Sequence, residues 1–391
     1  MKLLMIVQRY GSEVDGGAEL YCRWLAEHLL KAVDVTVLTT TARDYTTWDN
    51  YYQPGKTMVN NVPVIRMPVS CSRNMESFNA QTKSILAKDS TTQEQNDWLK
   101  AQGPWSPDLF DYLETNHNRY DLLLFTTYLY ITSVKGTTIA PEKSLLIPTA
   151  HDEPVAHLPV FHELYKRVAG LFYLTEPEKT FVEATYPVQN KPAIVLGTGV
   201  DLPHSSITPE SVVTRHNLKK PFLFYMGRVE AGKGCLRLIE RFLHYRNSVS
   251  SSLKLVLAGR KHIDIPNDES IIYTGFIPDN EVKPLLQASD IVVVPSAYES
   301  LSILLLQAFS CRRPVLANAD SPVLKTHCIN SNGGLFYSSD DEFSEALSLL
   351  ENKPDLRHRL GSNGYSYVQR NFTWTSVIDR FVLFCSELST R

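Results

Sequence analysis

The stretch that decides the fold is residues 2–38, KLLMIVQRYGSEVDGGAELYCRWLAEHLLKAVDVTVL. Residues 2–7 are an apolar run typical of a buried strand, and residues 18–30 have the spacing of an amphipathic helix. A glycine-containing loop at 11–17 separates them, and 33–38 is a second strand-like run. Because strand, loop, helix and strand follow in this order, we predict a parallel sheet with helices on both faces.

The same rhythm continues to about residue 196 and starts again after residue 203. The second series predicts strands at 222–226, 253–258, 271–273, 291–294 and 315–317. Two consecutive series of this kind predict an α/β protein with two Rossmann-like domains that face a cleft.

The predicted domains are residues 1–203 and 204–372, followed by a final amphipathic helix within 373–391. A polar, Gln- and Asn-rich insertion at about 70–105 interrupts the first domain, and we predict one helix in it at about 78–101.

Composition excludes several classes of protein. The 391 residues include 43% hydrophobic residues and carry a net charge of −3, which argues against a disordered chain and against a strongly cationic nucleic-acid binder. The six cysteines contain no Cys-x-x-Cys pair, so we expect reduced thiols in a cytoplasmic protein. The run at 1–7 is too short for a signal peptide, and we predict no transmembrane helix.

The strongest local signal is Gly-Arg-Val-Glu-Ala-Gly-Lys-Gly at 227–234, between a predicted strand and a predicted helix. Glycines let the backbone approach a ligand, and a helix N-terminus offers free N–H groups and a positive dipole. Arg228 and Lys233 add two cations, so the segment suits a diphosphate. The alternative is a solvated glycine-rich turn with two surface charges.

A second signal is Pro-Ser-Ala-Tyr-Glu-Ser-Leu-Ser at 295–302, which leads from a strand into a helix. It places Glu299 beside free amide groups, which favour its ionised form. In a helix, Gln307 would lie about 12 Å further along the axis and about 80° around it, broadly on the same side. The pair could then hold two parts of one extended ligand. The alternative is a capping Glu and a surface Gln.

Taken together, the chain resembles glycosyltransferase family 4, whose members are retaining enzymes with the GT-B fold. The resemblance covers nearly the whole chain except about 70–105. The segments that carry it are the phosphate motif at 227–234, a base-contacting loop at 274–279, a Glu-x7-Glu motif at 299–307, the following loop at 333–336, and Gly16-Gly17-Ala18-Glu19, Ala150-His151-Asp152-Glu153-Pro154 and Gly199-Val200-Asp201 in the first half.

The resemblance implies a role for each matching residue. Arg228 and Lys233, with Gly227 in the same loop, would bind the nucleotide-sugar diphosphate and stabilise the charge of the leaving group. Gly16 and Gly17 would present backbone N–H groups to the same diphosphate.

The remaining donor contacts follow from the other motifs. Glu299 would hydrogen-bond the transferred sugar, helped by the amides of Leu301 and Ser302, and Gln307 would reach the ribose. Ile277 and Asp279 would contact the base, and His151 would lie near the anomeric carbon. For His151 the alternative is a satisfied histidine at a strand end.

The resemblance also implies an activity. The first domain would bind the acceptor, the second would bind a UDP- or GDP-linked sugar, and the C-terminal crossover helix would pack back on the first domain. The expected enzyme is a metal-independent retaining hexosyltransferase without a cofactor. Its acceptor would be a hydroxyl of a glycan or lipid-linked glycan, as in bacterial surface polysaccharide or lipopolysaccharide synthesis, in the cytoplasm with at most peripheral contact at the inner membrane face.

Two departures leave other functions open. Gln307 replaces the second Glu of the family motif, and Leu301-Ser302 replaces the usual Phe-Gly. A non-catalytic GT-B subunit that binds glycan or a partner transferase is therefore one alternative, and a sugar-nucleotide epimerase on the same fold is another. A dehydrogenase is disfavoured because neither glycine-rich loop reads Gly-x-Gly-x-x-Gly with an acidic residue about 20 positions later.

Overall fold

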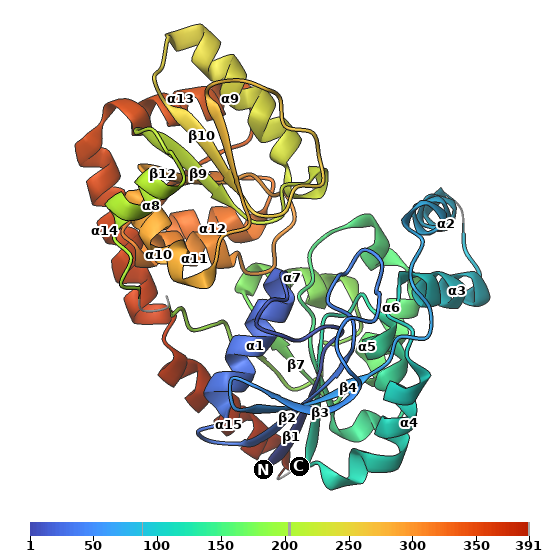
Figure 1. The fold of residues 1–391 in the computed structure, drawn as a ribbon. Helices are drawn as coiled ribbons and strands as arrows, with labels where there is room; N and C mark the ends of the chain where they lie inside the picture. The colour runs from blue at the N-terminus through green and yellow to red at the C-terminus, as the bar shows by residue number, and fades with distance from the viewer. Residues whose placement is uncertain (88, 202–204, 390–391) are drawn as a thin grey trace. The chain divides into compact units, whose positions relative to one another are not determined.

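The computed structural model describes residues 1–87, 89–201 and 205–389. The chain divides into two compact units, one formed by Met1–Thr198 with Val377–Arg391 and the other by Gly199–Ser376 (Figure 1). The predicted boundary at 203/204 lies outside the described residues.

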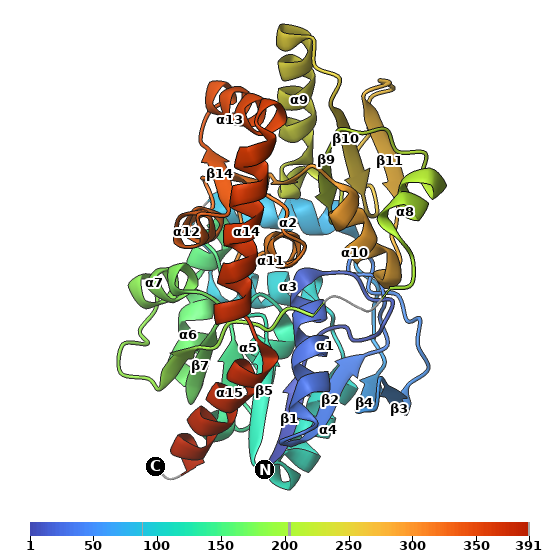
Figure 2. The same ribbon diagram turned by 90° about the vertical axis from the view of Figure 1, so that its left-hand side faces the viewer.

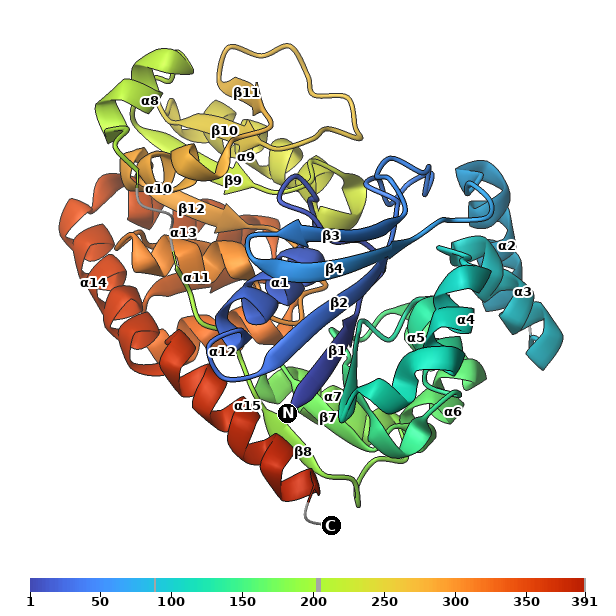
Figure 3. The same cartoon turned by 60° about the horizontal axis from the view of Figure 1, so that its bottom comes forward.

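The first unit is built on an eight-stranded sheet of order β3-β4-β2-β1-β5-β6-β7-β8. All neighbouring strands are parallel except β3 and β4, which form an antiparallel hairpin at one edge (Figure 3). The strands are β1 (Lys2–Ile6), β2 (Asp34–Thr40), β3 (Gly55–Val59), β4 (Val62–Met67), β5 (Leu122–Thr126), β6 (Ser144–Ile147), β7 (Gly170–Tyr173) and β8 (Ala193–Val195). The predicted parallel sheet is therefore confirmed.

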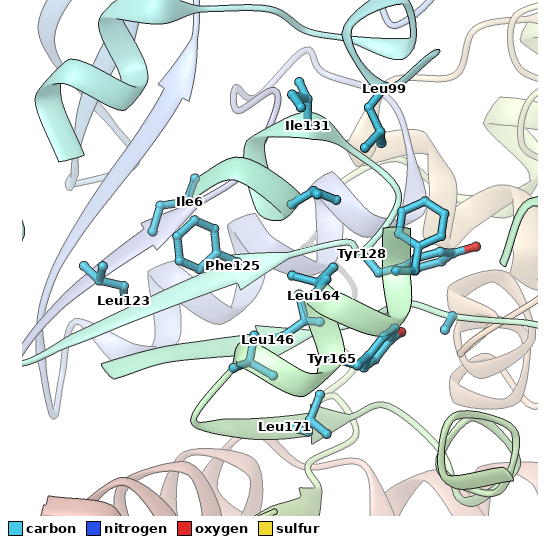
Figure 4. Close-up of a cluster of buried hydrophobic side chains, with 14 of the residues drawn as sticks. Ile6, Leu99, Leu123, Phe125, Tyr128, Ile131, Leu146, Leu164, Tyr165 and Leu171 are labelled. Atoms are coloured by element: carbon cyan, nitrogen blue, oxygen red, sulfur yellow. The ribbon is translucent and has the colours of Figure 1, made fainter. Parts of the chain in front are cut away.

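The main core of this unit lies where helices cover the central strands. Phe125 of β5, Leu146 of β6 and Leu164 of α6 meet there and are fully buried (Figure 4). Each such side chain contributes about 1.5–3 kcal/mol relative to its exposed state. The helices of the unit are α1 (Gly17–Leu29), α2 (Met75–Ala87), α3 (Thr92–Gln102), α4 (Pro107–Asn116), α5 (Ile131–Gly136), α6 (Pro159–Arg167) and α7 (Glu176–Thr185).

The insertion differs from its prediction, because it contains two helices, α2 and α3, rather than one. Thr91 is the N-cap of α3. Its hydroxyl accepts from the Glu94 backbone N–H, and the Glu94 carboxylate accepts from the Thr91 backbone N–H. This reciprocal cap starts a new helix. Trp98 of α3 donates to Thr82 of α2 at 2.9 Å, which holds the two helices together.

Strand β3 was not predicted. It leads into β4 through Asn60 and Asn61, both with left-handed backbone (φ 49° and 66°). Two left-handed residues form the turn that suits a two-residue hairpin, and asparagine tolerates this conformation better than most residues. The Asn-Asn pair between two strand-like segments was therefore the signal for the hairpin.

Helix α15 (Trp374–Ser389) is the expected C-terminal helix, and its residues from Val377 belong to the first unit. Phe381 stacks on Phe172 of β7 with ring centroids 4.9 Å apart, and the Arg380 guanidinium donates to the Leu196 carbonyl at 2.7 Å. The chain thus returns to its first unit after completing the second, as the resemblance implied.

The second unit has a six-stranded parallel sheet of order β11-β10-β9-β12-β13-β14 (Figure 2). Its strands are β9 (Phe222–Met226), β10 (Lys254–Ala258), β11 (Ile271–Gly275), β12 (Ile291–Val294), β13 (Val315–Asn318) and β14 (Gly334–Tyr337). Its helices are α8 (Pro209–Arg215), α9 (Cys235–Val249), α10 (Asp279–Ala288), α11 (Ile303–Ser310), α12 (Pro322–Ser331), α13 (Asp340–Asn352) and α14 (Pro354–Asn371). Numbered from β9 as strand 1 to β14 as strand 6, the strands lie across the sheet in the Rossmann order 3-2-1-4-5-6.

The segment 333–336 was predicted as a loop, but Gly334–Tyr337 forms the edge strand β14. A Cβ on Gly334 would lie 2.6 Å from the Val315 carbonyl oxygen, so glycine permits the close approach of β13. Gly334 therefore serves strand pairing rather than a loop.

Helix α14 was also not predicted, although it packs against α11 (Figure 2). Its contact depends on Gly361 and Gly364, whose hydrogens face the Arg312 carbonyl and the Phe309 ring. A Cβ at Gly361 would lie 2.1 Å from the Arg312 oxygen. Two helix-weakening glycines hide the helix in the sequence, yet they allow the helix to pack closely.

We predict that Gly361→Ala lowers the free energy of unfolding by about 1–3 kcal/mol, since the added methyl group must displace backbone. Gly232→Ala is the matched control in the same unit, because its Cβ meets nothing closer than 3.8 Å. Chemical denaturation of both variants checks the prediction. Equal stability of Gly361→Ala and the wild type would contradict the packing of α14.

Among the described residues, no helix combines the length and the apolar character that a membrane span requires.

Candidate functional site

The loop after β9 contains the predicted phosphate motif. Gly227 (φ 149°) and Gly234 (φ 75°) both take left-handed backbone, and a Cβ on Gly234 would lie 2.5 Å from the Pro295 carbonyl oxygen. A short 3-10 turn, Ala231–Lys233, leads into α9. The loop after β9 is therefore pressed against the loop after β12, and glycine is required at the contact.

Lys233 and Glu299 meet across these two loops. The Lys233 Nζ lies 2.8 Å from Glu299 Oε1, and their side chains are 28% and 15% exposed. Arg228 Nη2 lies 3.2 Å from Glu230 Oε1, and its backbone carbonyl accepts from the Tyr225 hydroxyl at 2.8 Å. The structure thus brings the predicted cations and the predicted sugar-binding carboxylate to one edge of the sheet.

The corner before α11 changes the predicted geometry of Gln307. Helix α11 begins at Ile303, after Ser302 with left-handed backbone (φ 66°, ψ 78°). The predicted offset of Gln307 from Glu299, about 12 Å along and about 80° around one helix, is therefore wrong, because Glu299 lies outside helix α11. Ser302 takes a conformation that glycine adopts freely, at the position where the family has glycine. The alternative of a capping Glu and a surface Gln does not hold, because Glu299 pairs with Lys233 and Gln307 is buried. That the two residues bind one ligand stays a prediction.

His327 of α12 supports this corner and was missed by the sequence reasoning. Its Nε2 lies 3.1 Å from the Leu301 carbonyl oxygen, and its Nδ1 lies 3.1 Å from the Tyr367 hydroxyl. The Leu301 carbonyl can only accept, so Nε2 carries the proton and Nδ1 accepts from Tyr367. Burial lowers the pKa of His327 to about 4, so the ring is neutral and fixes Leu301 in place.

The predicted base-contacting residues lie between β11 and α10. Asp279 is exposed at the first residue of α10, while the Ile277 side chain is 5% exposed. Ile277 therefore packs within the protein, and contact of Ile277 and Asp279 with a base stays a prediction.

In the first unit, the Gly16-Gly17 loop is held by a buried ion pair. Arg9 Nη2 lies 2.6 Å from Glu19 Oε1 and donates to the Asp15 carbonyl at 2.9 Å. Burial is the largest single effect and lowers the pKa of Arg9, but the charge and hydrogen bond of Glu19, together with Tyr130 and Asp15, raise this pKa above its ordinary value. A Cβ on Gly16 would lie 2.3 Å from the Glu19 carboxylate, so the Glu of the motif shapes the loop.

His151 follows β6 and is 26% exposed, with Nδ1 3.6 Å from Glu153 Oε1. The preceding residue, Ala150, donates its N–H to Glu178 Oε1 at 2.6 Å, and Leu174 donates to the other oxygen at 2.5 Å. Burial raises the pKa of Glu178 to about 8, against the backbone N–H groups that favour the carboxylate. Glu178 therefore anchors the loop that presents His151, and as a first-turn Glu of α7 it gave no sequence signal.

The predicted residues thus form two groups, one in each unit. Arg228, Lys233 and Glu299 come together in the second unit, whereas Gly16, Gly17 and His151 belong to the first. That the two groups bind the same diphosphate stays a prediction. Across the described parts of the chain, no group of three or more His, Cys, Asp or Glu side chains is arranged to hold a metal ion, and all six cysteines are free thiols.

Comparison with known proteins agrees with this architecture. Residues 206–367 match the model of the family described as glycosyl transferases group 1. The chain is 27% identical to the α-D-kanosaminyltransferase of Streptomyces kanamyceticus over 155 residues, which are 37% of this chain and 40% of that protein. It is 20% identical to an uncharacterized glycosyltransferase of Methanocaldococcus jannaschii over 96% of both chains. The chain thus spans less than half the length of the first relative.

Among solved structures, Anabaena HepE in complex with UDP and glucose superposes with a TM-score of 0.74 at 14% identity, covering 99% of this chain and 100% of that chain. The two units therefore have the GT-B fold. The chain resembles glycosyltransferase family 4, and the match to the group 1 model lies within its second unit.

We predict that His327→Gln changes the pH dependence of stability. The pKa of His327 is about 4 in the folded state and about 6.5 when unfolded, so the unfolded state binds more protons between these values. The wild type should therefore lose up to roughly 3 kcal/mol of unfolding free energy as pH falls from 6.5 to 4. His327→Gln should lack this loss, while His244→Gln, an exposed control, should retain it. Parallel pH profiles for His327→Gln and the wild type would refute the assignment.

Proposed function

We propose that this protein is a retaining glycosyltransferase that moves a hexose from a UDP- or GDP-linked donor to a hydroxyl of a glycan or lipid-linked glycan. The observation that carries the proposal is the position of the Lys233–Glu299 pair. Strands β9 and β12 are neighbours in the sheet. The strand that follows β9 in the chain, β10, lies on one side of this pair, and the strand that follows β12, β13, lies on the other, so the strand order reverses between them. In open α/β sheets, ligands bind outside the carboxyl ends of strands at such a switch point.

The electrostatics of these loops suit the departure of a nucleoside diphosphate. Breaking the bond between sugar and phosphate leaves negative charge on the phosphate oxygens, and fixed cations stabilise that charge. Arg228 and Lys233 supply two such cations beside the first turn of α9, whose N–H groups add a positive dipole end. The two positive charges are thus supplied by side chains of the protein itself.

The ion pair also suggests how the donor would be received. Lys233 and Glu299 satisfy each other at 2.8 Å. A diphosphate would compete for Lys233, and the released Glu299 would accept hydrogen bonds from sugar hydroxyls. Each such charged hydrogen bond contributes about 1.5–3 kcal/mol. Donor binding would then exchange one ion pair for contacts at both ends of the ligand.

The nucleophile would be the acceptor hydroxyl itself. In the family precedent it attacks the face from which the diphosphate leaves, and a phosphate oxygen takes its proton, so that configuration is retained. The oxygen–carbon bond forms as the carbon–phosphate oxygen bond breaks. Support for a UDP-linked donor comes from HepE, which was solved with UDP and glucose. A role in surface polysaccharide or lipopolysaccharide synthesis, metal independence, and location in the cytoplasm or at its membrane face remain part of the proposal.

The function is tested by incubating the purified chain with a panel of UDP- and GDP-sugars, with and without glycan acceptors, followed by NMR of the products. We expect transfer with retained anomeric configuration. Inverted configuration would contradict a retaining enzyme. Isomerised donor without acceptor would identify an epimerase, and no turnover with any donor would favour a non-catalytic subunit.

Arg228→Ala and Lys233→Ala should each lower kcat by about 10²–10³-fold, since each removes a charge that acts on the leaving group. Arg237→Ala is the control, because this exposed arginine of α9 pairs with Asp340 outside the loop. Steady-state kinetics checks the prediction. Near-normal rates in both loop variants would refute the phosphate assignment.

A further inference from the structure

A cationic pocket lies at the amino ends of the strands in the second unit. It has a volume of about 650 Å³ and is lined by Lys220, Arg312, Arg313 and Arg357, together with Glu210 and Asp290. Lys220 precedes β9, Asp290 precedes β12, and Arg313 lies two residues before β13. The pocket therefore faces the amino ends of these strands, about 13 Å from the loops at their carboxyl ends for strands of four residues.

The pocket has an excess of positive charge. Its four Lys and Arg side chains face two carboxylates, and none of the four forms an ion pair within the described parts of the chain. Asp290 uses one oxygen to accept the Phe222 backbone N–H at 3.0 Å. An uncompensated group of cations in a partly enclosed space attracts anions.

Neutral groups hold two of the arginines in place. Arg357 Nη1 donates to the Leu350 and Glu351 carbonyls at 2.6 and 2.8 Å, and Arg313 Nη1 donates to the Ser289 carbonyl at 3.1 Å. These hydrogen bonds orient the guanidinium groups but do not neutralise their charge. Buried Arg313 Nε lacks a hydrogen-bond partner.

The close packing of α14 forces these like charges together. Gly361 lies against the Arg312 backbone, and Arg357 is one helical turn earlier on the same helix. Burial lowers the pKa of Arg313, and the charge of Arg357 lowers it further, while Asp290 raises it. The fold thus maintains mutual repulsion that an anion would relieve. Arg312 adds a planar guanidinium, fixed 3.7 Å from the centre of the Tyr365 ring.

We propose that this pocket binds a phosphorylated anion, through the guanidinium groups of Arg312, Arg313 and Arg357 and the ammonium of Lys220. Guanidinium groups match phosphate oxygens in pairs, and the volume admits a ligand as large as a sugar phosphate or a nucleotide. Such a ligand would not compete for the Gly227–Gly234 loop, because the two lie at opposite ends of the strands. The inference does not depend on the proposed transferase activity.

The test uses inorganic pyrophosphate and isothermal titration calorimetry on the full chain. The background is Arg228→Ala/Lys233→Ala, which disables the other predicted anion site. We expect this background to bind pyrophosphate, and the added pair Lys220→Gln/Arg312→Gln to weaken binding at least tenfold. Both residues are at the rim, so folding should be retained. Arg357→Gln is an independent second variant with the same expected loss.

Arg359→Gln is the matched control on the same helix, because Arg359 is exposed and does not line the pocket; it should change the affinity less than threefold. Flotation with phosphatidylglycerol vesicles distinguishes a lipid headgroup from a free phosphate ester, since only a headgroup site would recruit the chain in a Lys220- and Arg312-dependent way. Absence of pyrophosphate binding in the background protein would overturn the proposal. So would equal affinity in the pocket variants and the control.

Discussion

The pairing of β9 with β12 is the constraint on which the candidate site depends. Residues Leu223 and Phe224 align with Ile291 and Val292, although about 65 residues of chain and two other strands separate them. The loops that leave the carboxyl ends of these two strands must therefore share one edge of the sheet. Lys233 and Glu299, distant in sequence, form their ion pair as a consequence of this adjacency.

Residues away from the proposed ligand keep these loops in place. Asn318 donates to the Pro295 carbonyl at 3.1 Å, the same group that excludes a side chain at Gly234. His327 binds the Leu301 carbonyl just before the left-handed Ser302. In the first unit, Arg9 and Glu178 have equivalent roles for the loops that contain Gly16 and His151. Buried polar groups thus fix the backbone, and the partly exposed groups remain available for chemistry.

The sequence predicted those parts of the fold that leave a local signal. Apolar runs marked the strands of both sheets except β3 and β14, and the two loops at the switch point carried glycine, cations and Glu299. It did not predict β14 or α14, because their glycines serve close packing against Val315 and Arg312, which only the folded chain reveals. The separation of α2 from α3 was visible in Thr91 and Glu94 but was outweighed by the continuous polar pattern around them.

Positioning residues were hardest to predict, since their partners lie far away in sequence. His327 bonds a carbonyl 26 residues earlier, and Glu178 bonds an amide 28 residues earlier. Neither spacing has a recognisable pattern. Gln307, by contrast, was located by motif, and its helix-based placement failed because Ser302 turns the backbone before α11 begins.

A crystal structure of the full chain with UDP tests the central claim most directly. The account predicts a diphosphate oxygen within hydrogen-bond distance of Lys233 Nζ and of the Arg228 guanidinium, with Lys233 and Glu299 drawn apart beyond the roughly 4 Å of an ion pair. A diphosphate bound elsewhere, with the Lys233–Glu299 pair still closed, would contradict it.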